Sequence, residues 1–159
     1  MTTVTVVGLG KIGLPLALQF AGSGATVLGA DTNPNVVEQV NAGQEPFPGE
    51  HDLQRRLSEA IEAGTLCATT DTTAAVADSD VVVVVVPLYV DADGAADFGW
   101  IDSATEAVGR GLKAGTLVVY ETTLPIGTTR ERFGAILSAE SGLAVEDEFT
   151  LAYSPERVF

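Results

Sequence analysis

The stretch VTVVGLGKIG at residues 4–13 is followed by LPLA at 14–17 and, a few residues later, by VLGAD at 27–31. An apolar, β-rich run thus leads into three glycines spaced G-x-G-x-x-G, and an acidic residue ends the next apolar run. Gly8 allows a tight turn out of the strand, Gly10 lacks a Cβ that would hold a bound group away, and Gly13 permits close helix packing. The pattern predicts a β-strand, a helix and a second, parallel strand.

This βαβ unit is typical of a dinucleotide-binding site. The N–H groups at the start of the helix, around Lys11 and Ile12, have no partners within the helix and can face a diphosphate, helped by the helix dipole. Asp31 can accept both ribose hydroxyls of an adenosine, whereas a 2′-phosphate would meet like charge. Neither Thr32 nor Asn33 supplies an arginine, so we expect NAD rather than NADP. The alternative is a ligand-free glycine turn in which Asp31 caps a helix.

The rest of the chain alternates short apolar runs with helical patterns. Strands are expected at 66–69, 81–86, 117–121 and 149–153, and helices at 34–41, 53–63, 72–77, 100–113 and 128–139. Such alternation predicts an α/β fold, a Rossmann-type doubly wound parallel sheet of about six strands with helices on both faces. No repeat or linker interrupts the pattern, so residues 1–159 are expected to form a single domain.

The run of six valines at 81–86 suits a central strand buried on both faces. Pro87 ends it, and residues 88–98 are expected to form a loop. Ligands of such sheets bind outside the carboxyl ends of the strands. The segments after Val7, Ala30, Val86, Glu121 and Tyr153 are therefore expected to converge on one crevice.

Composition excludes several classes of partner. The 159 residues carry 22 acidic and 8 basic side chains, a net charge of −14, so nothing could neutralise the phosphates of a nucleic acid or an anionic membrane. The longest apolar run is too short to span a bilayer, and the N-terminus has no signal-peptide pattern, which favours a cytoplasmic protein. The dispersed acids suggest a surface adapted to high salt; an ordinary acidic bacterial protein is the alternative.

Single residues carry further expectations. Cys67 is the only cysteine, so no intrachain disulfide and no cysteine-based metal site is predicted. It is expected to be a buried strand residue. His51 is expected to be a solvated loop residue. Trp100 is expected to pack at a helix start whose inward stripe is Ile101, Ala104, Val108 and Leu112. Thr128 and Glu131 have the spacing of a capping box.

Two residues at strand ends could do chemistry. Thr123, in a threonine-rich turn, could orient a water or a nicotinamide, and Glu156 could transfer protons at the mouth of the sheet. The alternatives are a satisfied turn hydroxyl before Pro125 and a surface acid paired with Arg157.

Three stretches extend these observations: GLGKIGLP at 8–15, ETTLPIGT at 121–128 and YSPERV at 153–158. In this order they resemble the N-terminal NAD-binding domain of the UDP-glucose/GDP-mannose dehydrogenase family. The similarity spans essentially the whole chain. It is closest to the UDP-N-acetyl-mannosamine dehydrogenase branch, through Pro87-Leu88, the segment 91–93 and the segment 104–108.

Members of that family oxidise the C6 alcohol of a nucleotide sugar twice, to a carboxylate, with two NAD⁺ and a cysteine thioester. The resemblance implies Asp31 on the adenosine ribose and Pro87, Leu88 and Thr123 beside the cofactor. It also implies that Thr123 helps hold the reacting water, that Glu156 activates water or transfers protons, and that Arg157 begins the segment that contacts a UDP-sugar.

The family's nucleophilic cysteine, its assisting lysine, its central dimerisation helix and its C-terminal nucleotide-binding domain would all lie beyond Phe159. We therefore expect this chain to bind NAD(H) without turnover, and its uncovered apolar faces or sheet edges could make it a homo-oligomer. Two alternatives remain: the cofactor domain of a β-hydroxyacid dehydrogenase, and a non-enzymatic module that binds dinucleotide.

Overall fold

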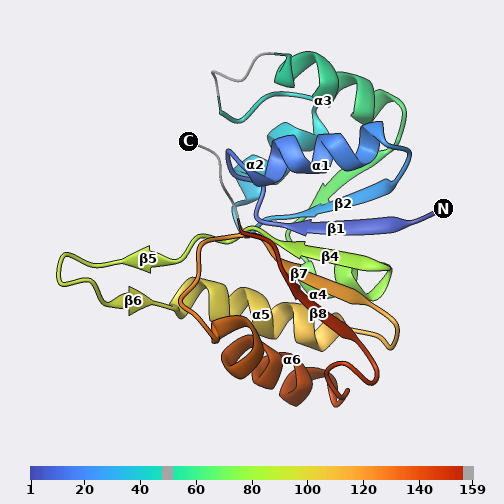
Figure 1. The fold of residues 1–159 in the computed structure, drawn as a ribbon. Helices are drawn as coiled ribbons and strands as arrows, with labels where there is room; N and C mark the ends of the chain where they lie inside the picture. Colours follow the sequence, from blue (N-terminus) through green and yellow to red (C-terminus); the bar gives the residue numbers. More distant parts are fainter. Residues whose placement is uncertain (48–51, 156–159) are drawn as a thin grey trace.

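The computed structural model describes residues 1–47 and 52–155, and its centre is a six-stranded parallel sheet (Figure 1). Its strands are β1 (Thr3–Val7), β2 (Thr26–Ala30), β3 (Leu66–Thr69), β4 (Val81–Val84), β7 (Leu117–Tyr120) and β8 (Thr150–Tyr153). They lie in the order β3-β2-β1-β4-β7-β8. From β1 the strands follow one another toward one edge of the sheet, and from β4 toward the other edge, so the topological switch point lies between β1 and β4. This order confirms the predicted Rossmann-type doubly wound sheet.

Helices cover both faces of the sheet (Figure 1). One side carries α1 (Gly13–Gly22), α2 (Pro34–Asn41) and α3 (Leu53–Glu62); the other carries α4 (Thr72–Ala77), α5 (Gly99–Gly111) and α6 (Gly134–Ser141). Each side has its own hydrophobic core, and the valines of β4 divide between them: Val83 faces the first core and Val82 and Val84 the second. A strand buried on both faces is therefore apolar without alternation.

Local sequence explains where two of these helices begin. The Asn33 side chain accepts a hydrogen bond from the N–H of Asn35 at 3.0 Å, and Pro34 occupies the first turn, where its missing N–H costs nothing. Asp71 caps α4 in the same way, accepting from the N–H of Ala74 at 3.0 Å. Both caps follow a strand directly, so they hold the strand-to-helix turns at the carboxyl edge of the sheet.

The prediction that Cys67 is buried is wrong. Its side chain is exposed, while Leu66 beside it is buried. Strand β3 forms one edge of the sheet, and α4 packs on β1 and β2. Because strand side chains alternate between faces, Leu66 reaches the first core and Cys67 points to the opposite, uncovered face.

The segment after β4 differs from the prediction in two ways. The strand ends at Val84, and although the N–H of Val85 still donates to the carbonyl of Val7 at 2.8 Å, the last two valines are only half-buried. Residues 88–98 are not a plain loop, because β5 (Tyr89–Val90) and β6 (Ala96–Asp97) pair as an antiparallel hairpin. The carboxylate of Asp91 accepts hydrogen bonds from two N–H groups of the hairpin turn and so stabilises it. Each strand has only two residues, which is too short for an alternating pattern to predict the hairpin.

The expected capping box at Thr128 is also wrong. Thr128 already has helical backbone angles and makes no side-chain cap, and the chain continues into a π-helical turn, η1 (Thr129–Phe133), before α6. The N–H of Glu131 donates to the carbonyl of Gly127 at 2.9 Å. Helical turns therefore begin ahead of Thr128, which leaves its side chain buried instead of capping.

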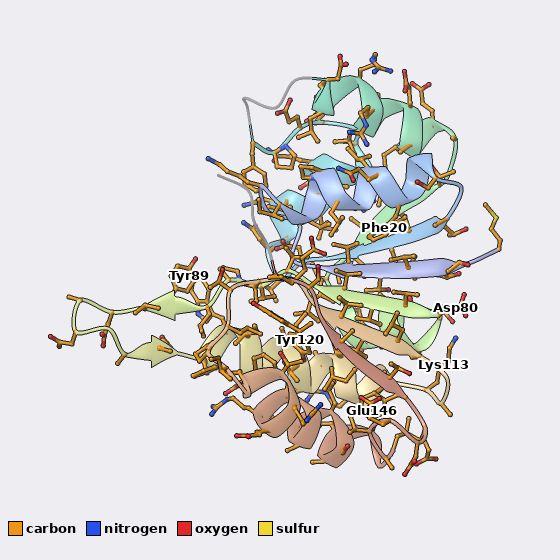
Figure 2. The ribbon with its side chains drawn as sticks, in the orientation of Figure 1. Phe20, Asp80, Tyr89, Lys113, Tyr120 and Glu146 are labelled. Carbon is orange, nitrogen blue, oxygen red and sulfur yellow. The ribbon has the colours of Figure 1, made fainter. Side chains whose placement is uncertain are left out.

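Helix α5 packs through a stripe that differs by one position from the expected one. Ile101, Thr105 and Val108 are fully buried, whereas Ala104 is only partly buried. The buried threonine is explained by Tyr120 of β7, which is labelled in Figure 2. Its hydroxyl shares a 2.8 Å hydrogen bond with the hydroxyl of Thr105 in α5. The Tyr120 ring stacks on Phe133 with centroids 4.4 Å apart. Burial raises the pKa of the Tyr120 phenol.

No helix within residues 1–47 and 52–155 combines the length and apolar character needed to cross a membrane.

Candidate dinucleotide-binding site

The glycine turn between β1 and α1 has the geometry that the sequence predicts. Gly8 adopts a φ of +94°, which favours glycine, and its N–H donates to the carbonyl of Ala30 at 2.8 Å. A Cβ on Gly13 would overlap the carbonyl oxygen of Gly8, so helix and turn are in direct contact. A Cβ on Gly10, by contrast, would meet no atom within 4 Å. The backbone at Gly10 is therefore open to an approaching ligand.

One contact of this turn was missed by sequence reasoning. The fully buried Leu9 side chain lies against Gly29 of β2, where a Cβ would come within 2.8 Å of a Leu9 methyl carbon. Gly29 is thus required because any larger residue would collide with the Leu9 side chain, and Leu9 anchors the glycine turn on β2. A lone glycine inside an apolar run was the available signal, because it marks close approach of another segment.

Asp31 joins the two turns at the ends of β1 and β2. Its carboxylate accepts hydrogen bonds from the N–H of Leu9 at 2.8 Å and from the N–H of Asn33 at 2.9 Å. One oxygen is used for each bond, and a carboxylate offers about four acceptor positions. Asp31 therefore holds the glycine turn in place and keeps acceptor capacity for ribose hydroxyls.

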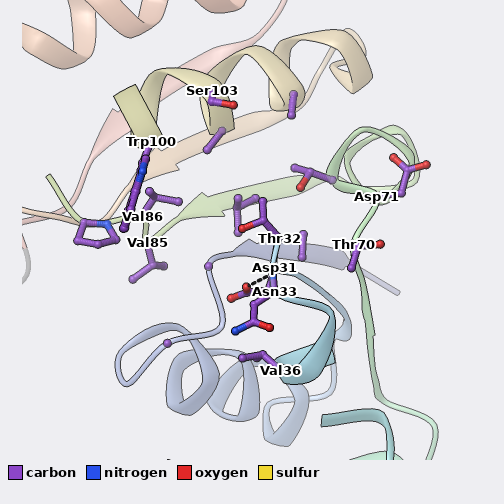
Figure 3. A pocket seen from close by; sticks show the side chains of 18 of the residues that line it. Asp31, Thr32, Asn33, Val36, Thr70, Asp71, Val85, Val86, Trp100 and Ser103 are labelled. Carbon is purple, nitrogen blue, oxygen red and sulfur yellow. Dashed lines mark hydrogen bonds between the residues drawn. The ribbon is translucent and has the colours of Figure 1, made fainter. Parts of the chain in front are cut away.

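These groups face a pocket of about 930 Å³ at the carboxyl edge of the sheet (Figure 3). The wall on the β1 and β2 side includes Gly8, Gly10, Asp31 and Asn33, and Val85, Val86 and Pro87 form the wall after β4. Residues 70–73, which are the turn after β3 and the start of α4, also line the pocket. The pocket is the size of a small-molecule site and combines apolar walls with a few polar groups.

A second stripe of α5 closes the pocket. Trp100, Ser103, Ala104, Ala107 and Arg110 all line it, and their spacing places them along one side of the helix. Trp100 lies at the start of α5 as predicted, but it does not pack into the interior, because 64% of its surface is exposed. Its ring meets Tyr89 of the hairpin edge-on, with centroids 4.8 Å apart.

The expected site residues do not all meet in this pocket. Gly8, Gly10, Asp31 and Pro87 line it; Lys11, Ile12, Gly13 and Leu88 are their neighbours in sequence but do not. Leu88 is instead packed against the second core. Thr123 is exposed in the turn after β7, on the other side of β4 from the glycine turn. Glu156, Arg157 and His51 lie outside the described residues.

The residues present fit a dinucleotide. The turn offers an open backbone at Gly10 and the start of α1, which carries no acidic side chain in its first turn, for a diphosphate. Asp31 supplies a carboxylate for a ribose one strand away, and Ala104 and Ala107 leave room for a flat base. The fold and site define a dinucleotide-binding domain.

Comparisons with known proteins agree. Residues 2–159 match the sequence profile of the UDP-glucose/GDP-mannose dehydrogenase family, NAD binding domain. A UDP-N-acetyl-D-mannosamine dehydrogenase from Pyrococcus horikoshii is 35% identical over 155 residues, which cover 98% of this chain and 36% of that protein. The chain therefore belongs to the UDP-glucose/GDP-mannose dehydrogenase family and is an NAD-binding domain of that family.

Solved structures show the same relationship. An NDP-N-acetyl-D-galactosaminuronic acid dehydrogenase from Methanosarcina mazei superposes with a TM-score of 0.93 at 33% identity, over 100% of this chain and 35% of that chain. A GDP-mannose dehydrogenase from Pseudomonas aeruginosa gives 0.91 at 26% identity, over 98% and 36%. The family resemblance is confirmed, and it favours this family over the β-hydroxyacid dehydrogenases. The chain spans little more than a third of the curated relatives it matches.

Proposed function

We propose that residues 1–159 form, as a single domain, the cofactor half of a UDP-sugar 6-dehydrogenase that oxidises a C6 alcohol to a carboxylate with two NAD⁺ per turnover. The observation that carries the proposal is the pocket in which Asp31 and the open glycine turn face the same space. The matched relatives named UDP-N-acetyl-D-mannosamine dehydrogenase support that UDP-sugar as the substrate. NAD supplies the hydride acceptor when bound.

Each site residue has a proposed role. The backbone from Gly8 to Gly13, with Lys11 and Ile12, holds the diphosphate, and Asp31 holds the adenosine ribose. Pro87, Leu88 and Thr123 contact the nicotinamide half, because they follow β4 and β7 at the same edge of the sheet. Glu156 transfers protons or activates water, with Thr123 positioning that water, and Arg157 contacts the UDP-sugar.

We propose further that these 159 residues do not turn over a UDP-sugar by themselves. The family chemistry passes through a cysteine thioester, and the single cysteine, Cys67, lies within edge strand β3, outside the pocket lining. Mixing the purified chain with NAD⁺ and UDP-N-acetyl-mannosamine should give no steady-state NADH, followed by absorbance. Sustained NADH production by the parent chain would contradict this proposal, and its loss in Cys67→Ala would then identify Cys67 as the nucleophile.

Cofactor choice is tested by calorimetric titration of NAD⁺ and NADP⁺ into the chain. NAD⁺ should bind more tightly, and Asp31→Ala should weaken it about tenfold to hundredfold, because a hydrogen bond to a charged group contributes about 1.5–3 kcal/mol. Asp78→Ala, which removes an exposed carboxylate after α4, is the matched control. Equal affinity of the parent for both dinucleotides would contradict the role of Asp31.

The sugar chemistry is tested in a chimera. Residues 1–159 replace the matching part of the Pyrococcus horikoshii enzyme, and the hybrid should oxidise UDP-N-acetyl-mannosamine. Glu156→Gln should then lower kcat by about 100-fold or more, the usual effect of losing a general acid or base, and Thr123→Ala should lower it less. A folded hybrid that binds NAD⁺ but never reduces it would favour the non-enzymatic alternative.

Setting and assembly are also proposals. The exposed free thiol of Cys67 suits a reducing compartment, which supports a cytoplasmic location. The net charge of −14 supports adaptation to high salt. The exposed Tyr89, Val90 and Trp100 support self-association, which sedimentation measurements over a concentration series would detect.

A further inference from the structure

The exposed indole of Trp100 is the largest apolar group to which the proposed cofactor and catalytic contacts assign no role. It is 64% exposed yet lines the same pocket as Gly8, Gly10 and Asp31. In Figure 3 it extends from the start of α5 toward Val85 and Val86, on the opposite side of the end of β4 from Asp31. An exposed tryptophan at a pocket mouth is a candidate ligand contact, since burial of its surface on binding is favourable.

The surrounding structure fixes this indole. The Asp97 carboxylate accepts the N–H of Gly99 at 2.9 Å, which sets the turn from the hairpin into α5. Tyr89 packs edge-on against the ring at an interplanar angle of 82°. Two residues of this region also contact Arg132 of η1: its guanidinium lies 4.3 Å from the centre of the Phe98 ring and donates a 2.8 Å hydrogen bond to the Asp102 carboxylate. The start of α5 is therefore tied to η1, and the backbone that carries Trp100 is held from both sides.

The residues next along the stripe are small. Ser103, Ala104 and Ala107 follow Trp100 along the pocket wall, so this wall has one large flat group beside a shallow floor. A dinucleotide bound by the glycine turn and Asp31 would lie in the pocket between these groups and the α5 wall. An indole offers it an apolar face for a sugar or base and one N–H for an oxygen.

We propose that Trp100 is a cofactor-contacting residue that covers the bound dinucleotide from the side opposite the glycine turn. This inference rests on the proposed placement of NAD in the pocket. Trp100 holds the cofactor against the sheet and excludes water from one side of it, and Tyr89 positions the indole. The ligand class is a dinucleotide, and the contact is separate from the Asp31 contact that selects NAD over NADP.

The chain contains one tryptophan, which makes the test direct. NAD⁺ is titrated while tryptophan emission is recorded, with free N-acetyl-tryptophanamide as the absorbance control; NADH is titrated for energy transfer from the indole. Calorimetry measures affinity for the parent, Trp100→Ala, Trp100→Phe and Val90→Ala. Val90 is the matched control, because it is 61% exposed in the hairpin next to Tyr89, the ring partner of Trp100, but does not line the pocket.

We expect quenching of the indole, energy transfer to bound NADH, and about tenfold weaker binding for Trp100→Ala, with Trp100→Phe and Val90→Ala within about threefold of the parent. Melting temperatures should stay within about 2 °C of the parent, because the side chain is exposed. If NAD⁺ binds by calorimetry but leaves the tryptophan emission unchanged, and Trp100→Ala binds as tightly as the parent, the inference about Trp100 is overturned while the proposed function stands. An absence of binding heat in the parent would overturn the proposed function and this inference with it.

Discussion

At the scale of single residues, Asp31 has a structural role beside its proposed ligand role. Its carboxylate accepts the N–H groups of Leu9 and Asn33 and so ties the β1 turn to the β2 turn. Asp31→Ala should therefore lower the free energy of unfolding without any cofactor, by about 1–3 kcal/mol, because two N–H groups lose a charged acceptor. Urea denaturation measures it.

Asp31→Asn separates the two roles. An amide keeps one acceptor oxygen and should recover part of the lost stability, while its weaker acceptor should still reduce NAD⁺ affinity. Asp78→Ala should change the unfolding free energy by no more than about 0.5 kcal/mol, as is usual for exposed positions. If Asp31→Ala is as stable as the parent, the bonds to the two turns contribute nothing measurable.

Tyr120 predicts how stability responds to alkaline pH. Burial raises its pKa above the ordinary value of 10.0, so the native state keeps the phenolic proton while the unfolded state loses it. The contribution of Tyr120 is fully present below pH 10 and is lost as the pH rises from there toward the native pKa. The unfolding free energy is measured from about pH 8 to about pH 11, a range that includes the ordinary pKa of a phenol. It should fall toward the alkaline end of this range.

Tyr120→Phe is the control for that decline. It should cost about 1 kcal/mol at neutral pH through the lost hydrogen bond to Thr105. Its unfolding free energy should then fall less steeply above pH 10 than that of the parent. Parallel pH curves for the two proteins would show that other groups cause the alkaline loss.

At the scale of elements, α5 carries two functional sides. Ile101, Thr105 and Val108 pack in the core, and the stripe from Trp100 to Arg110 faces the pocket. Ala107→Leu should fill the pocket and weaken NAD⁺ binding by about tenfold or more, since overpacking a fitted contact costs about 1–3 kcal/mol. Ala77→Leu, at an exposed position of α4, is the control. An Ala107→Leu variant that binds like the parent would place the base elsewhere.

The sequence predicted the elements whose pattern extends over several residues. All six sheet strands and the glycine turn carry such patterns, and each was found. The β5–β6 hairpin has only two residues per strand, so no periodicity could reveal it. Cys67 was predicted to be buried from its strand pattern, and Trp100 to pack at the start of a helix, yet an edge position and a pocket mouth leave both exposed. The contact of Leu9 with Gly29 depends on tertiary packing between neighbouring strands.

At the scale of the whole molecule, charge dominates. The net charge is −14 and the isoelectric point about 4.1, so the compact state carries strong self-repulsion at neutral pH. Added KCl shortens the screening length from about 30 Å at 0.01 M to about 3 Å at 1 M. The melting temperature should therefore rise by several degrees over that range in the cofactor-free chain.

A variant with less negative charge tests the cause of that rise. Glu38→Lys, Glu62→Lys and Asp78→Lys together replace three exposed acids on three different helices or their ends. Because each exchange removes a negative charge and adds a positive one, the variant should melt higher than the parent at low salt and gain less from KCl. If both proteins gain equally, the salt acts through general strengthening of apolar burial, and the dispersed acids are then not an adaptation to salt.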